Sequence, residues 1–184
     1  MKSRYVVVAL GTISLFLGVA GCGGSSGPDV TVGSHRRGPS AAAAPAPAQT
    51  NPAGNQVVRY RGLTFSVPAD WPVYDLASDP TRCVRFDVHA VYLGTPGADQ
   101  DCPAHLVGKT DSVIVEPIDA QSAGRAAVAS QARSINGLDV SVDPSAETGH
   151  NVVAAFRAAA VLATVAYGAD ASTAQTILNS FAAS

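Results

Sequence analysis

The sequence predicts an α+β domain, and two patterns carry this prediction. Several short runs rich in β-branched and aromatic residues are bounded by glycine, proline or Asn-Gly, which is typical of strands joined by turns. Near the C-terminus, Ala174, Ile177, Leu178 and Phe181 recur at the i, i+3, i+4, i+7 spacing of one helix face. We expect this helix to pack its apolar stripe against a sheet.

The first predicted strands form a hairpin. Residues 57–60 and 63–67 are β-prone runs on either side of Gly62, and Pro68 ends the second run because it has no N–H to donate. Residues 84–93 alternate with period two, which predicts a half-buried strand with Arg85, Asp87 and His89 on its polar face.

The remaining elements follow in order along the chain. Residues 112–116 predict a short strand, the Ala-rich residues 121–133 a helix weakened by Gly124, and residues 138–142 a strand after the turn Asn136-Gly137. Residues 151–156 and 161–167 predict a final hairpin, although the alanines between them also allow a helix. Ser172 and Gln175 form a capping-box pair that begins the last helix.

The N-terminus has the pattern of a secretory signal. Lys2 and Arg4 precede an uncharged apolar stretch that is shorter than the roughly 20 residues of a membrane span. The stretch ends at Val19-Ala20-Gly21-Cys22, which resembles a bacterial lipobox. The resemblance implies a lipoprotein signal peptide over residues 1–21, cleavage before Cys22 and acylation of its thiol. The alternative is an uncleaved membrane anchor, and either outcome places the domain outside the cytoplasm.

Residues 22–55 predict a disordered tether behind the lipidated cysteine. This Ala/Pro/Gly/Ser tract holds almost no apolar side chain large enough to offset the entropy cost of ordering a backbone. The remaining residues, 56–184, suffice for one globular domain. Loss of Lys2 and Arg4 leaves 10 basic and 14 acidic residues, a net charge of −4, which argues against a nucleic-acid partner.

Cys83 and Cys102 are predicted to form a disulfide. Once Cys22 is acylated, they are the only thiols of the 184-residue chain, in an oxidising compartment. The alternatives are free thiols or a metal site with His89 or His105, although the close ligand pairs typical of zinc sites are absent.

No catalytic, cofactor-binding or metal-binding set is predicted. Within residues 56–184 the sequence has neither a G-x-S-x-G elbow nor an H-E-x-x-H motif. A speculative surface site comprises Trp71, Arg85, Asp87 and His89, extended by Asp99, Asp101 and His105 from the following loop. The alternative interpretation is a solvated sheet face, with Trp71 in the core rather than stacked on a sugar ring.

Two stretches resemble known families. Residues 60–71, Tyr-Arg-Gly-Leu-Thr-Phe-Ser-Val-Pro-Ala-Asp-Trp, and the terminal helix with Ile177-Leu178-Asn179-Ser180-Phe181 resemble PsbP-like domains of actinobacterial lipoproteins. That resemblance implies an α/β/α sandwich with a central antiparallel sheet, used for binding and scaffolding and without catalytic residues. Residues 79–108 resemble a small module of secreted actinobacterial proteins that can precede a glycoside-hydrolase-like domain.

We therefore expect a lipoprotein on the outer face of the cytoplasmic membrane, anchored at Cys22, that binds an envelope protein or glycan without catalysis. A second hypothesis is a cell-wall glycan-binding protein or hydrolase. A third is a carrier that holds a lipid or another apolar ligand between helix and sheet.

Overall fold

The computed structural model describes residues 49–50, 54–143 and 145–184. The predicted signal peptide, Cys22 and most of the predicted tether lie outside these residues. Two described residues of the tether range, Gln49 and Thr50, form strand β1, which pairs with β2. No helix within the described ranges is both long and apolar enough to cross a bilayer.

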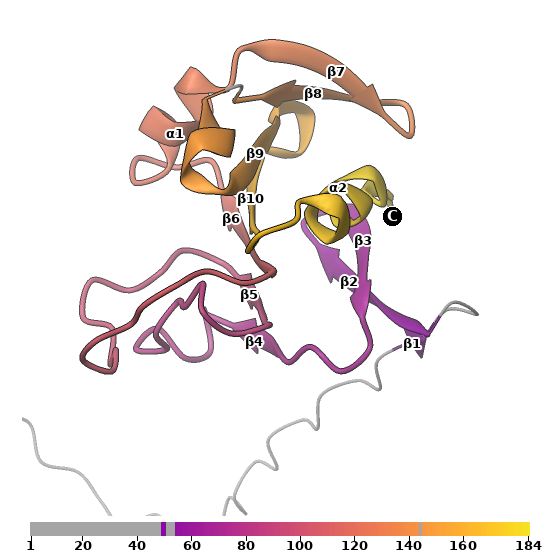
Figure 1. Ribbon diagram of the computed structural model, residues 1–184. Helices are drawn as coiled ribbons and strands as arrows, with labels where there is room; N and C mark the ends of the chain where they lie inside the picture. The colour runs from indigo at the N-terminus through magenta and orange to yellow at the C-terminus, as the bar shows by residue number, and fades with distance from the viewer. Residues whose placement is uncertain (1–48, 51–53, 144) are drawn as a thin grey trace, which may run out of the picture. The chain divides into compact units, whose positions relative to one another are not determined.

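Two β-sheets and two short α-helices confirm the α+β class (Figure 1). The smaller sheet has the order β1-β2-β3-β11 and the larger sheet the order β4-β5-β6-β10-β9-β8-β7. The elements are β1 (Gln49–Thr50), β2 (Asn55–Tyr60), β3 (Leu63–Pro68), β4 (Val73–Asp75), β5 (Val91–Leu93), β6 (Ser112–Pro117), α1 (Ala123–Val128), β7 (Gln131–Ile135), β8 (Leu138–Val142), β9 (Asn151–Phe156), β10 (Val161–Ala166), α2 (Ser172–Asn179) and β11 (Ala182–Ala183).

The predicted hairpin around Gly62 and the predicted turn at Asn136-Gly137 are confirmed, and the second turn joins two strands where a helix and a strand were expected. β2 pairs with β3 around Arg61-Gly62, and β7 pairs with β8 around Asn136-Gly137. All four turn residues have positive φ, as the type I′ turn requires. The last hairpin is also confirmed: β9 and β10 pair over six residues, and the alanines between them form only a 3₁₀ turn, Arg157–Ala159.

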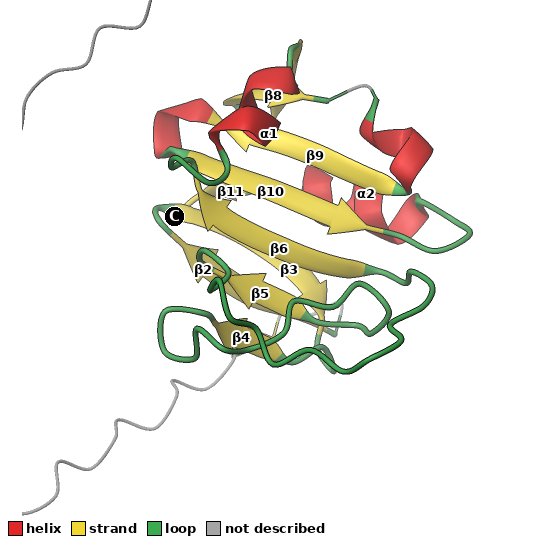
Figure 2. Cartoon of the chain, turned by 90° about the vertical axis from the view of Figure 1, so that its left-hand side faces the viewer, coloured by secondary structure: helices red, strands yellow, loops and turns green. Residues whose placement is uncertain are grey.

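The larger sheet is mixed, which corrects the expectation of a wholly antiparallel central sheet. β4, β5 and β6 run parallel, whereas β6, β10, β9, β8 and β7 are antiparallel. Parallel neighbours need a long crossover connection. Here both crossovers are irregular loops on one face of the sheet, visible below β5 in Figure 2.

The strand predicted over residues 84–93 is wrong for residues 84–90, because only Val91–Leu93 forms a strand. The alternating apolar side chains Val84, Phe86 and Val88 pack instead against a buried cluster that includes Leu76 and Tyr92. Side-chain and loop hydrogen bonds hold this backbone, for example from the Val84 N–H to Gln100 Oε1 at 2.8 Å. The period-two pattern of residues 84–90 therefore arises from a loop whose apolar side chains pack on the sheet.

The predicted helix over residues 121–133 is too long. α1 ends at Val128, and residues from Gln131 onward belong to β7. The Asn136-Gly137 turn pairs Ile135 with Leu138 and so places the residues before it opposite β8. Strand pairing therefore outweighs the helix propensity of this alanine-rich segment.

The capping box predicted for α2 is also wrong. The N-cap is Ala171, and no side chain caps the helix. The Ser172 hydroxyl instead donates to Asp170 Oδ2 at 2.8 Å, while the Ser172 N–H donates to Asp170 Oδ1 at 2.9 Å. These hydrogen bonds lower the pKa of Asp170, since they favour its ionised form.

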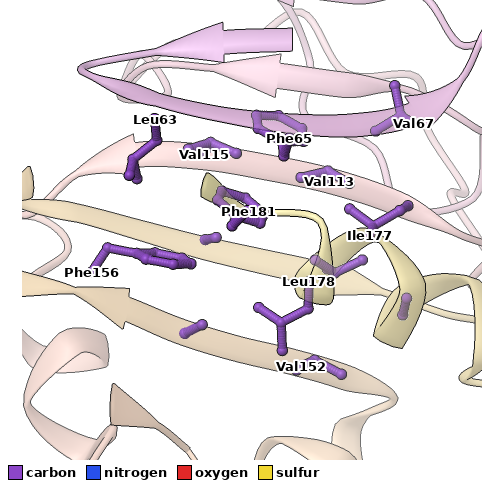
Figure 3. Close-up of a cluster of buried hydrophobic side chains, with 14 of the residues drawn as sticks. Leu63, Phe65, Val67, Val113, Val115, Val152, Phe156, Ile177, Leu178 and Phe181 are labelled. Carbon is purple, nitrogen blue, oxygen red and sulfur yellow. The ribbon is translucent and has the colours of Figure 1, made fainter. Parts of the chain in front are cut away.

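The main core lies between the two sheets and α2. The predicted apolar residues Ala174, Ile177, Leu178 and Phe181 are all buried, each at most 2% exposed, although α2 ends at Asn179 and Phe181 follows it. Phe181 stacks between Phe65 of β3 and Phe156 of β9 at ring distances of 4.6 and 4.7 Å (Figure 3). On the opposite face of the larger sheet, Ala126 of α1 and Ala129, which follows the helix, pack on Val153, Ala155 and Leu162 (Figure 2).

Candidate functional site

The candidate site is a pocket of about 480 Å³ beside the disulfide, at the β4 edge of the larger sheet. Its wall combines the end of β4, the loop that follows it, and the residues leading into β5. The lining residues are Pro72, Tyr74, Asp79, Thr81, Arg82, Cys83, Arg85, Val88, His89, Ala90, Tyr92, Asp101 and Pro103.

The predicted Cys83–Cys102 disulfide is confirmed, with the Cα atoms 4.8 Å apart. An isolated β-bridge joins the neighbouring residues Arg82 and Asp101. Together these links bring residues 101–103 against residues 81–83 and so close one side of the pocket. A disulfide of this kind is typical of proteins outside the cytoplasm.

Removing this bridge should destabilise the domain. For the Cys83→Ser/Cys102→Ser variant we expect a loss of about 3 kcal/mol in unfolding free energy, the chain-entropy value for a loop of this size. Urea unfolding measures the difference in unfolding free energy, and the parent protein treated with reductant is the control. Alkylation of the oxidised, acylated protein should label no thiol. Two labelled cysteines would contradict the bridge.

Arg85 and Asp87, two of the predicted site residues, bind each other. Arg85 Nη2 lies 2.7 Å from Asp87 Oδ2, and Arg85 Nε donates to Asp87 Oδ1 at 3.0 Å. This fork lowers the pKa of Asp87, because the hydrogen bonds favour the carboxylate. Arg85 lines the pocket whereas Asp87 does not, so Asp87 acts by orienting Arg85.

His89 lines the pocket above Trp71. The Asp111 carbonyl accepts a hydrogen bond from His89 Nδ1 at 2.9 Å. The two ring centroids are 5.2 Å apart, and Trp71 is only 5% exposed. Trp71 therefore belongs to the core and supports His89, and a sugar ring has no access to its face.

Several pocket residues were not among those the sequence singled out, and Tyr74, Asp79 and Arg82 form one contacting group among them. Arg82 lies over the Tyr74 ring at 4.5 Å from its centroid, and its Nη2 is 3.1 Å from Asp79 Oδ2. Tyr74 stacks in turn on Tyr92, with ring centroids 5.5 Å apart. Nothing in the local sequence marks this group, because the parallel pairing of β4 with β5 is what brings Tyr74 beside Tyr92.

The loop residues added to the predicted site are only partly brought to it. Asp101 lines the pocket, whereas Asp99 and His105 do not. Within residues 54–143 and 145–184, no three His, Cys, Asp or Glu side chains are grouped to hold a metal ion. The alternative metal site at Cys83 and Cys102 is excluded because both sulfurs are in the disulfide.

Comparisons with protein families, curated proteins and solved structures find no match to this chain.

Proposed function

We propose that this protein is a membrane-anchored lipoprotein whose domain is a non-enzymatic binding module of the cell envelope. The lipobox-like Val19-Ala20-Gly21-Cys22 supports acylation, and the disulfide supports a location outside the cytoplasm. The resemblance of residues 60–71 to PsbP-like domains fits helices on opposite faces of a sheet, as α1 and α2 lie here.

The pocket beside the disulfide is the proposed ligand site, and its lining is the observation that carries the proposal. Arg82 and Arg85 present guanidinium donors, while Asp79 and Asp101 present carboxylate acceptors. The two arginines are held by Asp79 and Asp87 before any ligand arrives. Such preorganised polar groups bind with little loss of side-chain entropy.

An envelope glycan is the ligand that this lining favours. Each hydroxyl group of a sugar both donates and accepts hydrogen bonds. A planar carboxylate or guanidinium group of the pocket can therefore bind two neighbouring sugar hydroxyls at once. Asp79 accepts hydrogen bonds from Arg82 Nε at 3.1 Å and from the Thr81 hydroxyl at 3.0 Å, so it orients the Arg82 side chain at the pocket.

Titration with soluble fragments of the cell-wall glycan tests this function. We expect the Arg82→Ala/Arg85→Ala variant to bind at least about tenfold more weakly, since one hydrogen bond to a charged group is worth about 1.5–3 kcal/mol. Arg133→Ala removes an exposed arginine of β7 that does not line the pocket, and should bind like the parent. Equal binding by all three proteins would refute the assignment of this pocket as the ligand site.

The lipid anchor is tested separately. In fractionated cells, the Cys22→Ala variant should no longer be found in the membrane fraction.

A further inference from the structure

Strand β7 is an edge of the larger sheet whose outer side is open. Within the described residues it pairs only with β8, and its first four residues, Gln131–Ser134, are exposed. Figure 1 shows β7 as the outermost strand of the sheet. The other edge strands, β1, β4 and β11, are only two or three residues long, and short edges offer little to a partner. β7 instead pairs with β8 over five consecutive residues without a bulge or a proline.

The register of β7 with β8 determines which backbone groups of β7 point away from the sheet. Ile135 and Leu138 flank the two-residue turn and are therefore a hydrogen-bonded pair. Hydrogen-bonded and non-hydrogen-bonded pairs alternate along an antiparallel ladder, so Ala132 and Ser134 direct their N–H and C=O groups outward. No backbone hydrogen bond from a turn, a loop or another strand of the described chain reaches these four groups.

The tip of the β7–β8 hairpin is tied to the end of α2. The Asn136 Nδ2 group donates to the Asn179 carbonyl and to the Phe181 carbonyl, both at 2.9 Å. β8 pairs with β9 at only two positions, so these side-chain hydrogen bonds hold the part of the hairpin that extends past β9. The outer edge of β7 is thus a preorganised template, which a partner strand meets with little further loss of entropy.

The charge at the centre of β7 indicates which kind of strand fits this edge. Only a polypeptide offers the alternating N–H and C=O groups that complete a sheet edge. A second copy of β7, paired antiparallel with full overlap, would place the two Arg133 side chains opposite each other, and like charges in that position are destabilising. Arg133 belongs to none of the ion pairs of the described residues. A strand with an acidic residue opposite Arg133 therefore complements this edge better than a second copy does.

We propose that the outer edge of β7 binds an extended, acidic segment of another protein, which adds an antiparallel strand to the larger sheet. Ala132 and Ser134 form the main-chain hydrogen bonds. Arg133 pairs with a carboxylate at the non-hydrogen-bonded position between them, where opposing side chains are closest. None of these residues lines the pocket beside the disulfide, so this peptide site and the glycan site stand or fall separately.

Fluorescence anisotropy of a labelled, capped peptide, Thr-Val-Glu-Val-Thr, titrated with the full-length Cys22→Ala chain, tests the proposal. The two valines oppose Ala132 and Ser134 when the glutamate opposes Arg133. We expect saturable 1:1 binding. Methylation of both valine nitrogens should weaken it at least about tenfold, because two ladder donors are lost. Lysine in place of glutamate should weaken it about threefold, and Arg133→Glu should reverse this preference.

Two proline variants separate binding at the edge from folding of the hairpin. Ala132→Pro removes an outward N–H only, so its melting temperature should stay close to that of the parent while peptide binding weakens at least about tenfold. Arg133→Pro removes a donor to β8 and should melt at a lower temperature. Arg59→Ala removes an exposed arginine of β2 and should bind the peptide like the parent.

Several outcomes would overturn the proposal. They are absence of peptide binding by the parent, parent-like binding by Ala132→Pro or of the methylated peptide, and equal affinity for the glutamate and lysine peptides. Self-association of the parent in sedimentation, abolished by Ala132→Pro, would instead assign the edge to a second copy of the chain. If Ala132→Pro fails to fold, the charge reversal in Arg133→Glu still decides between these results.

Discussion

Replacing Arg125 with alanine is expected to lower the free energy of unfolding by about 3 kcal/mol at neutral pH. Breaking a buried ion pair by removing one partner typically costs about 3–5 kcal/mol, and the lower value applies because Arg125 itself is partly exposed. Arg125 Nη2 lies 2.7 Å from Glu116 Oε2, and the Glu116 side chain is fully buried in β6. Without Arg125, the carboxylate has no described partner, since Oε1 already accepts no hydrogen bond.

The loss should depend on pH. Burial raises the pKa of Glu116, and Arg125 opposes that rise. An acid whose pKa is raised in the folded state destabilises the protein as pH rises from the unfolded pKa through the folded one. Arg125→Ala should raise this pKa further, so its penalty should be large at neutral pH and small in acid, where Glu116 is protonated in both states.

A double-mutant cycle measured by urea unfolding tests this pair. In the Glu116→Gln background, Arg125→Ala should cost much less than in the parent, because no charge remains to be left buried. Glu116→Gln alone serves as the matched control. A penalty that is independent of pH and equal in both backgrounds would show that Arg125 acts only through packing of its stem.

Replacing Phe181 with alanine is the other large effect, with an expected loss of about 3–5 kcal/mol. Phe181 is completely buried and its ring stacks on Phe65 of the smaller sheet and Phe156 of the larger sheet. Its removal therefore opens a cavity at the junction of both sheets with α2, where the surrounding strands cannot easily collapse.

Chemical denaturation measures the effect of Phe181→Ala. Asn179→Ala, at the exposed C-terminal end of α2, is the control and should change stability by no more than about 0.5 kcal/mol. Phe181→Leu should lose less than Phe181→Ala because it fills part of the cavity. A loss for Phe181→Ala as small as that for the control would refute the role of this side chain in joining the sheets.

The elements predicted correctly are those that local sequence specifies. Gly62 and Asn136-Gly137 permit tight turns, so the β2–β3 hairpin and the turn that precedes β8 follow from backbone preferences at single residues. The i, i+3, i+4, i+7 spacing of Ala174, Ile177, Leu178 and Phe181 predicted a buried apolar face, and all four side chains are buried. The disulfide followed from the number of cysteines and the expected compartment.

The errors arise where distant contacts outweigh local preference. Val84, Phe86 and Val88 alternate because they lie on the sheet from a loop, and no local pattern distinguishes that loop from a strand. Residues 131–133 favour a helix by composition, but the turn at Asn136 pairs them with β8. Ser172 was expected to cap α2, yet Asp170 competes for its hydroxyl.

For the candidate site, the sequence by itself determined that Arg85 and His89 are polar residues beside a disulfide-bonded loop. Only the tertiary structure decided that Tyr74, Asp79 and Arg82 join them, that Trp71 is buried beneath His89, and that Asp99 and His105 are not part of the pocket. The physical reason is the same for each: parallel pairing of β4 with β5 and closure of the Cys83–Cys102 loop are long-range events. Side-chain periodicity indicates which face of a segment is buried, but it does not indicate which other segment packs against that face.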